Sequence, residues 1–132
     1  HSCFEKNPLK LIGFEGSGLQ VRDALHPKDL TPLLFRQMQE PDKDAPKIIN
    51  LGGGEGNSMS LKQLTFWCTE RFGANEVIAS GEERPMDAPW IVMDSSMARE
   101  AWDWVPQTQI ENILDEIAVH AEQNPDWLSF TT

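Results

Sequence analysis

The chain of 132 residues contains no tyrosine and only two cysteines. The first absence excludes any reaction that needs a phenol hydroxyl from this chain. Cys3 and Cys68 lie far apart, without a CxxC pair or a histidine cluster, so we expect a terminal thiol and a small apolar helix residue. No apolar run is long enough to span a bilayer and no signal-peptide pattern is present, which predicts no membrane partner and a cytoplasmic location.

Basic residues are scarce as well. The 11 Lys and Arg residues stand against 21 Asp and Glu residues, which gives a net charge of −10 and a pI near 4.6. A surface of this charge repels a polyanion, and the sequence has no basic run. We therefore expect no nucleic acid partner.

Strand-like and helical segments alternate along the chain, which indicates an α/β or α+β fold. We expect one small domain over residues 1–132, with short strands, about four helices and no Rossmann domain. The expected strands are Leu9–Ile12, Leu19–Leu25, Lys47–Leu51, Glu76–Ala79 and Trp90–Met93. The first two are expected to form a hairpin through the glycine-rich residues 13–18.

Helical periodicity predicts four helices, which begin near Pro27 or Asp29, at Ser60, at Asp94 or Ser95, and at Thr108. Capping boxes are expected for two of them, from Ser60 with Gln63 and from Thr108 with Glu111. The apolar face of the first helix is expected to consist of Leu30, Leu33, Leu34 and Met38.

Two charged residues, Arg22 and Asp23, interrupt the strand predicted at residues 19–25. Side chains alternate along a strand, so one of the two points inward or into a cleft, where a charge needs a partner. The planar fork of donors on arginine suits a carboxylate or a phosphate. Arg22 is therefore a candidate binding residue.

The loop Gly52–Gly56 lies between a predicted strand and a helix, where phosphate-binding turns are found. Asn57 stands where a dinucleotide fingerprint needs glycine or alanine, and the Gly-Lys-Ser/Thr of a P-loop is missing. The pattern favours a flexible turn, with a dinucleotide site as the alternative.

The loop Arg84–Asp87 is the second candidate for binding, because its proline stiffens the segment. A fixed arginine beside a fixed carboxylate can hold a phosphate and a ribose hydroxyl, and a surface salt bridge is the alternative. His26 and His120 have no Ser or Cys partner nearby, and the carboxylates show no metal-ligand spacing. Neither acid–base catalysis nor a metal site is indicated.

Four of these segments occur in one order and spacing: residues 13–30, the Asn-Leu-Gly-Gly-Gly run at 50–54, the loop at 84–87 and residues 94–106. Together they resemble the nucleotide-sugar epimerases and dehydratases of the extended short-chain dehydrogenase/reductase family, most of all its CDP-paratose 2-epimerase branch. The resemblance implies a substrate-binding lobe for a nucleotide sugar, with a CDP-sugar as a candidate. It places a diphosphate against Arg22 and Arg84 and a ribose against Asp87, and it adds Gln20 and Asn57 to the substrate site.

In this family an N-terminal Rossmann domain carries the NAD loop and the catalytic Tyr-x-x-x-Lys, and this chain contains neither. The resemblance therefore implies a truncated or stand-alone lobe that binds no NAD by itself and is not catalytic alone. The alternative is an interaction or oligomerisation protein whose pocket no longer functions. We expect a homodimer or a partner chain to cover apolar faces near Leu25, Trp67 or the last helix. One departure from the family stands at Met86, where its members have glycine.

Overall fold

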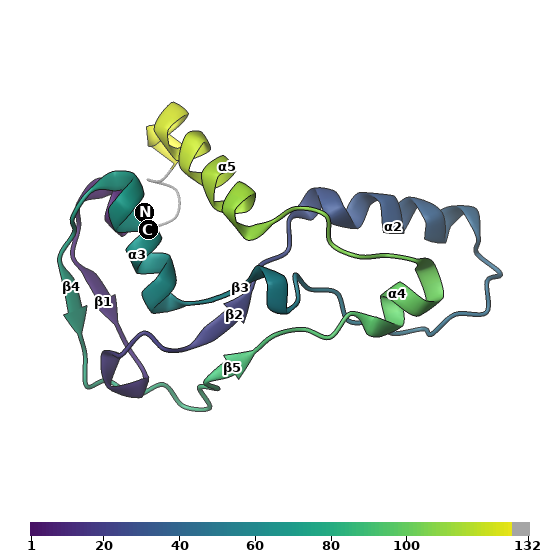
Figure 1. Cartoon of the computed structure of the whole chain (residues 1–132), viewed down its shortest axis with the longest axis horizontal. Helices are drawn as coiled ribbons and strands as arrows, with labels where there is room; N and C mark the ends of the chain where they lie inside the picture. The colour runs from purple at the N-terminus through teal and green to yellow at the C-terminus, as the bar shows by residue number, and fades with distance from the viewer. Residues whose placement is uncertain (128–132) are drawn as a thin grey trace. The chain divides into compact units, whose positions relative to one another are not determined.

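The computed structural model describes residues 1–127, which contain short strands and helices in alternation and confirm the α/β class. The helices are α1 (Ser2–Glu5), α2 (Pro27–Gln39), α3 (Leu61–Phe72), α4 (Ser96–Trp102) and α5 (Ile110–Gln123) (Figure 1). The strands are β1 (Leu9–Leu11), β2 (Val21–Asp23), β3 (Ser58–Ser60), β4 (Val77–Ala79) and β5 (Trp90–Ile91).

The strands form two small sheets. β1 pairs with β4 in parallel, and the other sheet has the order β3-β2-β5, in which β2 and β5 are parallel. The expected hairpin between β1 and β2 is therefore wrong, because the two strands belong to different sheets.

The turn after β1 explains why no hairpin forms. Gly13, Phe14, Glu15 and Gly16 all have positive φ, at 77°, 48°, 56° and 70°. Gly16 is required here, since a Cβ would lie 2.5 Å from the backbone nitrogen of Ser80. The ends of this turn bond to the segment after β4, because Ser80 N donates to Leu11 O and Gly13 N donates to Glu82 O, so β4 and not β2 lies beside β1.

The chain divides into two compact units. Within the described residues, the first unit comprises 1–22, 59–91 and 117–127, and the second unit comprises 23–58 and 92–116. The prediction of a single domain over residues 1–132 stays a prediction.

In the first unit, the short helix α1 packs against α3. The rings of Phe4 and Phe72 meet edge to face, with centroids 5.7 Å apart. Cys3 is buried, and Cys68 lies on α3 as expected. Burial of Cys68, together with its contact to Cys3, raises the pKa of its thiol to about 11. Cys68 therefore behaves as a small apolar group rather than as a reactive thiolate.

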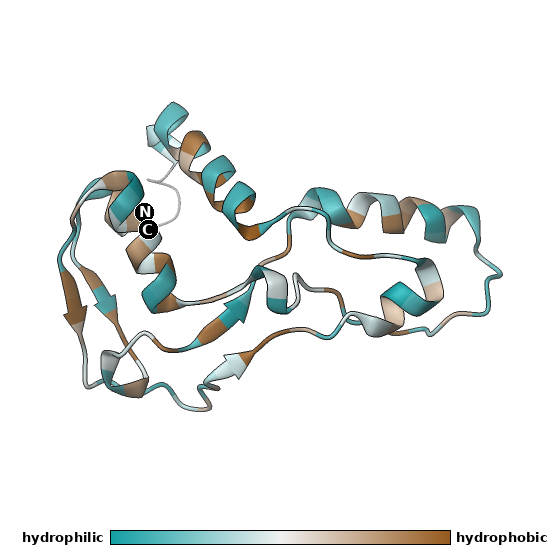
Figure 2. Cartoon of the chain, in the orientation of Figure 1, coloured by the Kyte–Doolittle hydropathy of each residue, from teal (hydrophilic) through white to brown (hydrophobic). Residues whose placement is uncertain are grey.

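The expected capping box at the start of α3 is present. The Ser60 hydroxyl accepts from the backbone of Gln63, and the Gln63 side chain accepts from the backbone of Ser60. Gly73, with φ 83°, ends the helix. The following strand β4 is hydrophobic along its length, yet its side chains are exposed (Figure 2).

The core of the second unit is a cluster of buried residues formed by Leu33, Ala98, Trp102 and Trp104. Partly buried residues pack around it, namely Leu25, Leu30, Ala45, Ile49, Leu51 and Ala101. Only part of the expected apolar face of α2 takes part, because Leu34 is 55% and Met38 78% exposed. Successive residues lie about 100° apart around a helix, so the side of α2 that buries Leu33 turns Leu34 outward.

The expected strand at Lys47–Leu51 is not formed. No strand is assigned to this segment, and Ile48 is 83% exposed, while Ile49 and Leu51 pack against the cluster around Leu33. The side chains of this segment therefore alternate between exposed and partly buried, but within residues 1–127 no other strand lies beside the segment to pair with it. An apolar pattern cannot show whether such a neighbouring strand is present.

A buried carboxylate organises the same unit. Asp29 accepts hydrogen bonds from the backbone nitrogens of Gln107 (3.1 Å) and Thr108 (3.0 Å) and from the Thr108 hydroxyl (3.0 Å). Thr108 was expected to cap α5, but its hydroxyl is donated to Asp29 and the helix begins at Ile110. Burial acts to raise the pKa of Asp29, but these hydrogen bonds and the charge of His26 outweigh it and lower the pKa.

Candidate functional site

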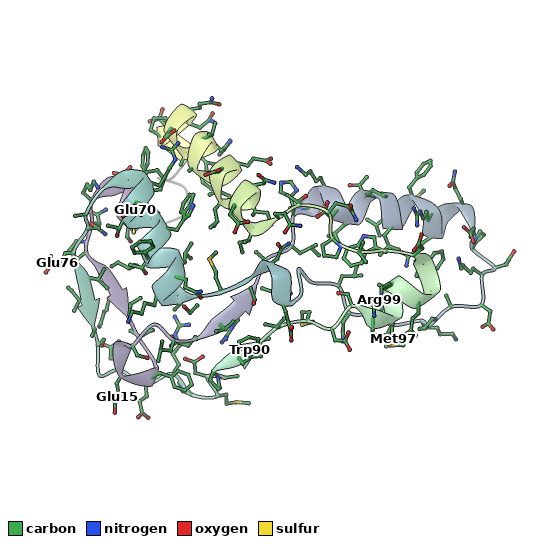
Figure 3. The ribbon with its side chains drawn as sticks, viewed as in Figure 1. Glu15, Glu70, Glu76, Trp90, Met97 and Arg99 are labelled. Atoms are coloured by element: carbon green, nitrogen blue, oxygen red, sulfur yellow. The ribbon has the colours of Figure 1, made fainter. Side chains whose placement is uncertain are left out.

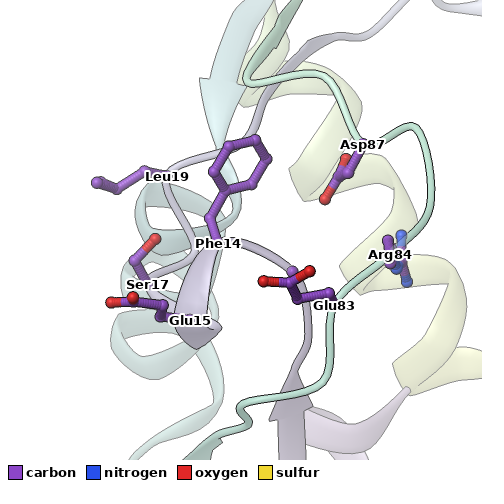
Figure 4. A pocket seen from close by; sticks show the side chains of 8 residues that line it. Phe14, Glu15, Ser17, Leu19, Glu83, Arg84 and Asp87 are labelled. Carbon is purple, nitrogen blue, oxygen red and sulfur yellow. The ribbon is translucent and has the colours of Figure 1, made fainter.

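The first unit contains a pocket of about 600 Å³ between the turn after β1 and the loop before β5 (Figure 4). Its lining consists of Gly13, Phe14, Glu15, Ser17, Leu19, Glu83, Arg84 and Asp87. Two backbone hydrogen bonds join the segments that carry these residues, from Gly13 to Glu82 (2.8 Å) and from Ser80 to Leu11 (2.9 Å). The sequence therefore brings two distant loops together as the walls of one pocket.

Three of the predicted site residues form a connected group beside this pocket. Arg22 on β2 donates from its guanidinium to the Asp87 carboxylate (3.2 Å) and to the carbonyls of Ala88 (3.0 Å) and Val21 (2.7 Å). Gln20 donates from its amide to the other Asp87 oxygen (3.2 Å). Asp87 is thus held from two sides, and its side chain is only 9% exposed.

The Arg22 guanidinium is partly occupied by these bonds. Three of its N–H groups are used on protein acceptors, and the side chain is 40% exposed. The N–H groups that remain are open to a further acceptor. Arg22 therefore holds parts of the protein together through these hydrogen bonds and still has N–H groups that could donate to a ligand.

Gly13 allows this group to approach the turn closely. A Cβ at this position would lie 2.4 Å from the Asp87 carboxylate and 3.0 Å from the Gln20 amide nitrogen. Its φ of 77° is also one that glycine adopts readily. Gly13 is therefore needed for the carboxylate of Asp87 to line the pocket.

Arg84, the fourth predicted residue, lies on the wall of the pocket (Figure 4). Its guanidinium has no hydrogen bond or ion pair within residues 1–127, so every donor is available to a ligand. Two positions on, Met86 has φ 59° and is fully exposed. The chain thus keeps the left-handed turn that glycine would enter more easily.

Asn57, the fifth predicted residue, belongs to the second unit. Its side chain is 3% exposed and donates to the carbonyl of Thr108 at 2.7 Å. This contact gives Asn57 a structural contribution within that unit. Its assignment to substrate binding stays a prediction.

The glycine loop that was weighed as a dinucleotide site is filled by the protein itself. A Cβ on Gly53 would lie 1.9 Å from the Ala24 carbonyl, and one on Gly52 would lie 2.4 Å from the Asp23 carboxylate. The backbone nitrogen of Gly54 donates to the same carboxylate at 3.0 Å. Because an acidic side chain stands where a phosphate would bind, this loop does not fit NAD.

Sequence reasoning missed five side chains that line the pocket: Phe14, Glu15, Ser17, Leu19 and Glu83. Glu15 lies on the tight turn after β1, at the position that Figure 3 labels. The sequence does show a glycine-rich loop at residues 13–18 and a charged loop at residues 80–89, but nothing in it shows that the two loops face each other. Their pairing follows from the parallel β1–β4 sheet.

No helix within residues 1–127 is long and apolar enough to cross a membrane. The same part of the chain contains no group of three or more His, Cys, Asp or Glu side chains placed to hold a metal ion.

Comparisons with known proteins agree with this architecture. The chain is 29% identical to CDP-paratose 2-epimerase of Salmonella typhi over 103 residues, and 27% identical to UDP-glucose 4-epimerase of Caenorhabditis elegans over 115 residues. It is similar to nucleotide-sugar epimerases. No protein-family model matches the sequence.

The epimerase similarity concerns a partial domain. The two alignments cover 78% and 85% of this chain but only 30% and 32% of the relatives, so the chain spans about a third of their length. Among solved structures, MoeE5 in complex with UDP-glucuronic acid and NAD matches with a TM-score of 0.57 and 20% identity. That match covers 85% of this chain and 38% of MoeE5, and it supports the fold.

Proposed function

We propose that this chain binds the nucleoside diphosphate portion of a nucleotide sugar in the pocket lined by Arg84 and Asp87. Arg84 and the spare donors of Arg22 take the diphosphate, and Asp87 accepts from a ribose hydroxyl. The names of the relatives support this choice, since one acts on a CDP-sugar and the other on a UDP-sugar. A CDP-sugar is the finer form of the proposal.

One observation carries the proposal: a guanidinium without a partner within residues 1–127 lies on the same pocket wall as the fixed carboxylate of Asp87. An unpaired arginine is suited to a phosphate, because its planar donors match the phosphate oxygens. The pocket volume of about 600 Å³ also lies within the range of small-molecule sites.

The chain on its own is proposed to be non-catalytic and to bind no NAD. It has no tyrosine for the family's catalytic Tyr-x-x-x-Lys, and its glycine loop at Gly52–Gly54 is occupied by Asp23. Its own residues would hold and orient the nucleotide, and proton transfer at the sugar would depend on groups outside this sequence.

The direct test is calorimetric titration of the chain with CDP and UDP, repeated on Arg84→Ala. Loss of one charge-assisted contact to phosphate is expected to weaken binding of both nucleotides by roughly tenfold or more. Arg99→Ala is the matched control, because Arg99 is an exposed arginine of the second unit and does not line the pocket. Equal affinities for wild type and Arg84→Ala would refute the proposal.

A second candidate function, a protein-interaction module, rests on the exposed face of α2. Leu34, Phe35 and Met38 are 55%, 59% and 78% exposed there, which is unusual for three neighbouring apolar side chains. Leu25 and Trp67, where coverage was expected, are only half-buried. If the chain forms a homodimer through α2, light scattering should give twice the chain mass for wild type and the mass of one chain for Phe35→Glu. A wild type with the mass of one chain would exclude the dimer.

A further inference from the structure

Two carboxylates in the pocket, those of Glu15 and Glu83, have no partner in the part of the chain that the structure describes. Neither makes a hydrogen bond or an ion pair within residues 1–127. The neighbouring acids differ, because Glu82 is paired with Lys10 and Asp87 with Arg22. The unpaired carboxylates therefore remain as acceptors for a ligand.

The pocket contains both a positively charged group, the Arg84 guanidinium, and negatively charged carboxylates. Arg84 and Glu83 are adjacent in the sequence, but in Figure 4 the Glu83 carboxylate extends away from Arg84, toward the turn that carries Phe14 and Glu15. An anionic group of a ligand held by Arg84 would leave its other end near the carboxylates. Acceptors at that end favour a ligand whose far end carries hydrogen-bond donors.

Apolar surface accompanies the carboxylates. Phe14 is 40% and Leu19 61% exposed, and both line the same pocket. An exposed aromatic face stacks on a flat ring and tolerates any nucleobase, so it contributes affinity without choosing between bases. The choice is left to the polar groups around the ring.

We propose that Glu15 and Glu83 select a nucleobase that presents an amino group, and so favour a cytidine diphosphate over a uridine diphosphate. A carboxylate accepts from the amino group at C4 of cytosine, whereas uracil has a carbonyl oxygen at C4 and offers the carboxylate no donor at that position. This inference rests on the proposed function, because it requires the diphosphate to lie at Arg84. It adds which side chains distinguish the two bases and the physical reason for the preference.

The test is calorimetric titration with CDP and UDP on wild type and on the double variant Glu15→Gln, Glu83→Gln. Wild type should bind CDP about tenfold or more tightly than UDP, the scale of one hydrogen bond to a charged group. Glutamine keeps the size and offers both a donor and an acceptor, so the CDP-to-UDP ratio should fall toward one in the variant. Glu76→Gln, an exposed glutamate of the same unit outside the pocket, should keep the wild-type ratio (Figure 3).

The outcomes separate the two proposals. Wild type that binds CDP and UDP equally, or a double variant that keeps the full preference, would overturn the selection by Glu15 and Glu83 and leave the diphosphate site intact. Arg84→Ala should weaken both nucleotides by the same factor and preserve their ratio. Wild type that binds neither nucleotide would overturn the proposed function and the base selection with it.

Discussion

At the scale of single residues, the two arginines of the site differ in what already holds them. Arg22 is bound to Asp87 and to two carbonyls, whereas Arg84 has no partner within residues 1–127. Substitution of Arg22 therefore affects the protein before any ligand arrives. Arg84 offers the cleaner measure of binding.

Arg22→Ala is expected to destabilise the chain by about 1 kcal/mol, because it removes hydrogen bonds to Asp87 and Ala88 at a site that is partly open to solvent. Arg84→Ala should change the free energy of unfolding by less than about 0.5 kcal/mol. Urea denaturation monitored by tryptophan fluorescence measures both values. Equal stability of the two variants would contradict the structural contribution of Arg22.

Asp29 predicts a dependence of stability on pH. Its pKa in the folded state lies below the ordinary value of 3.8, so its stabilising contribution is complete above that value and is lost as the pH falls toward the folded-state pKa. Asp29→Asn should cost about 1–3 kcal/mol at neutral pH, since the donors of Gln107 and Thr108 lose a charged acceptor.

The difference in free energy of unfolding between wild type and Asp29→Asn should become smaller when denaturation is repeated below about pH 4. Asp44→Asn, an exposed loop carboxylate of the same unit, serves as the control and should change little at either pH. A difference that stays constant with pH would show that the carboxylate charge of Asp29 is not what stabilises the fold.

At the scale of elements, the glycine loop after residue 51 packs its backbone closely against the residues at the end of β2. Gly53 lies against the Ala24 carbonyl so closely that no Cβ fits, while Gly56 has open space around it. The loop brings its backbone onto the end of β2 and uses the Asp23 carboxylate as the acceptor for Gly54. The two glycines therefore make a matched pair for testing this close approach.

Gly53→Ala should lower the free energy of unfolding by about 1–3 kcal/mol or more, because the added methyl group overlaps the Ala24 carbonyl. Gly56→Ala should be nearly neutral, since nothing lies within 4 Å of its Cβ. Thermal denaturation followed by circular dichroism compares them. Equal melting temperatures for both variants would rule out the close packing at Gly53.

Local patterns in the sequence predicted where helices begin and end better than they predicted which segments pair with each other. The Ser60–Gln63 capping box and the stop at Gly73 are properties of a few neighbouring residues, and both were confirmed. The hairpin at residues 13–18 and the strand at 47–51 were wrong, because pairing depends on which distant segment lies alongside. Thr108 looked like a helix cap, but a buried acid distant in sequence takes its hydroxyl.

The candidate site was predictable to the same extent. The motifs identified Gln20, Arg22 and Asp87, and the structure connects the three by hydrogen bonds. Phe14 and Glu83 could not be found, because their place in one pocket follows from the tertiary contact between two loops. Binding itself stays a proposal for all of these residues.

At the scale of the whole molecule, the chain corresponds to about a third of the epimerases that it resembles. The pocket is nevertheless built entirely from residues of the first unit. We propose that this pocket holds the diphosphate of a nucleotide without residues from the second unit.

The measurement that tests it most directly is a two-dimensional ¹H–¹⁵N NMR spectrum of the chain, titrated with CDP. We expect saturable shifts that concentrate on the amides of residues 13–19 and 83–87, and that weaken in Arg84→Ala but persist in Arg99→Ala. No shifts at saturating nucleotide, or shifts centred on the Gly52–Gly56 loop, would contradict it.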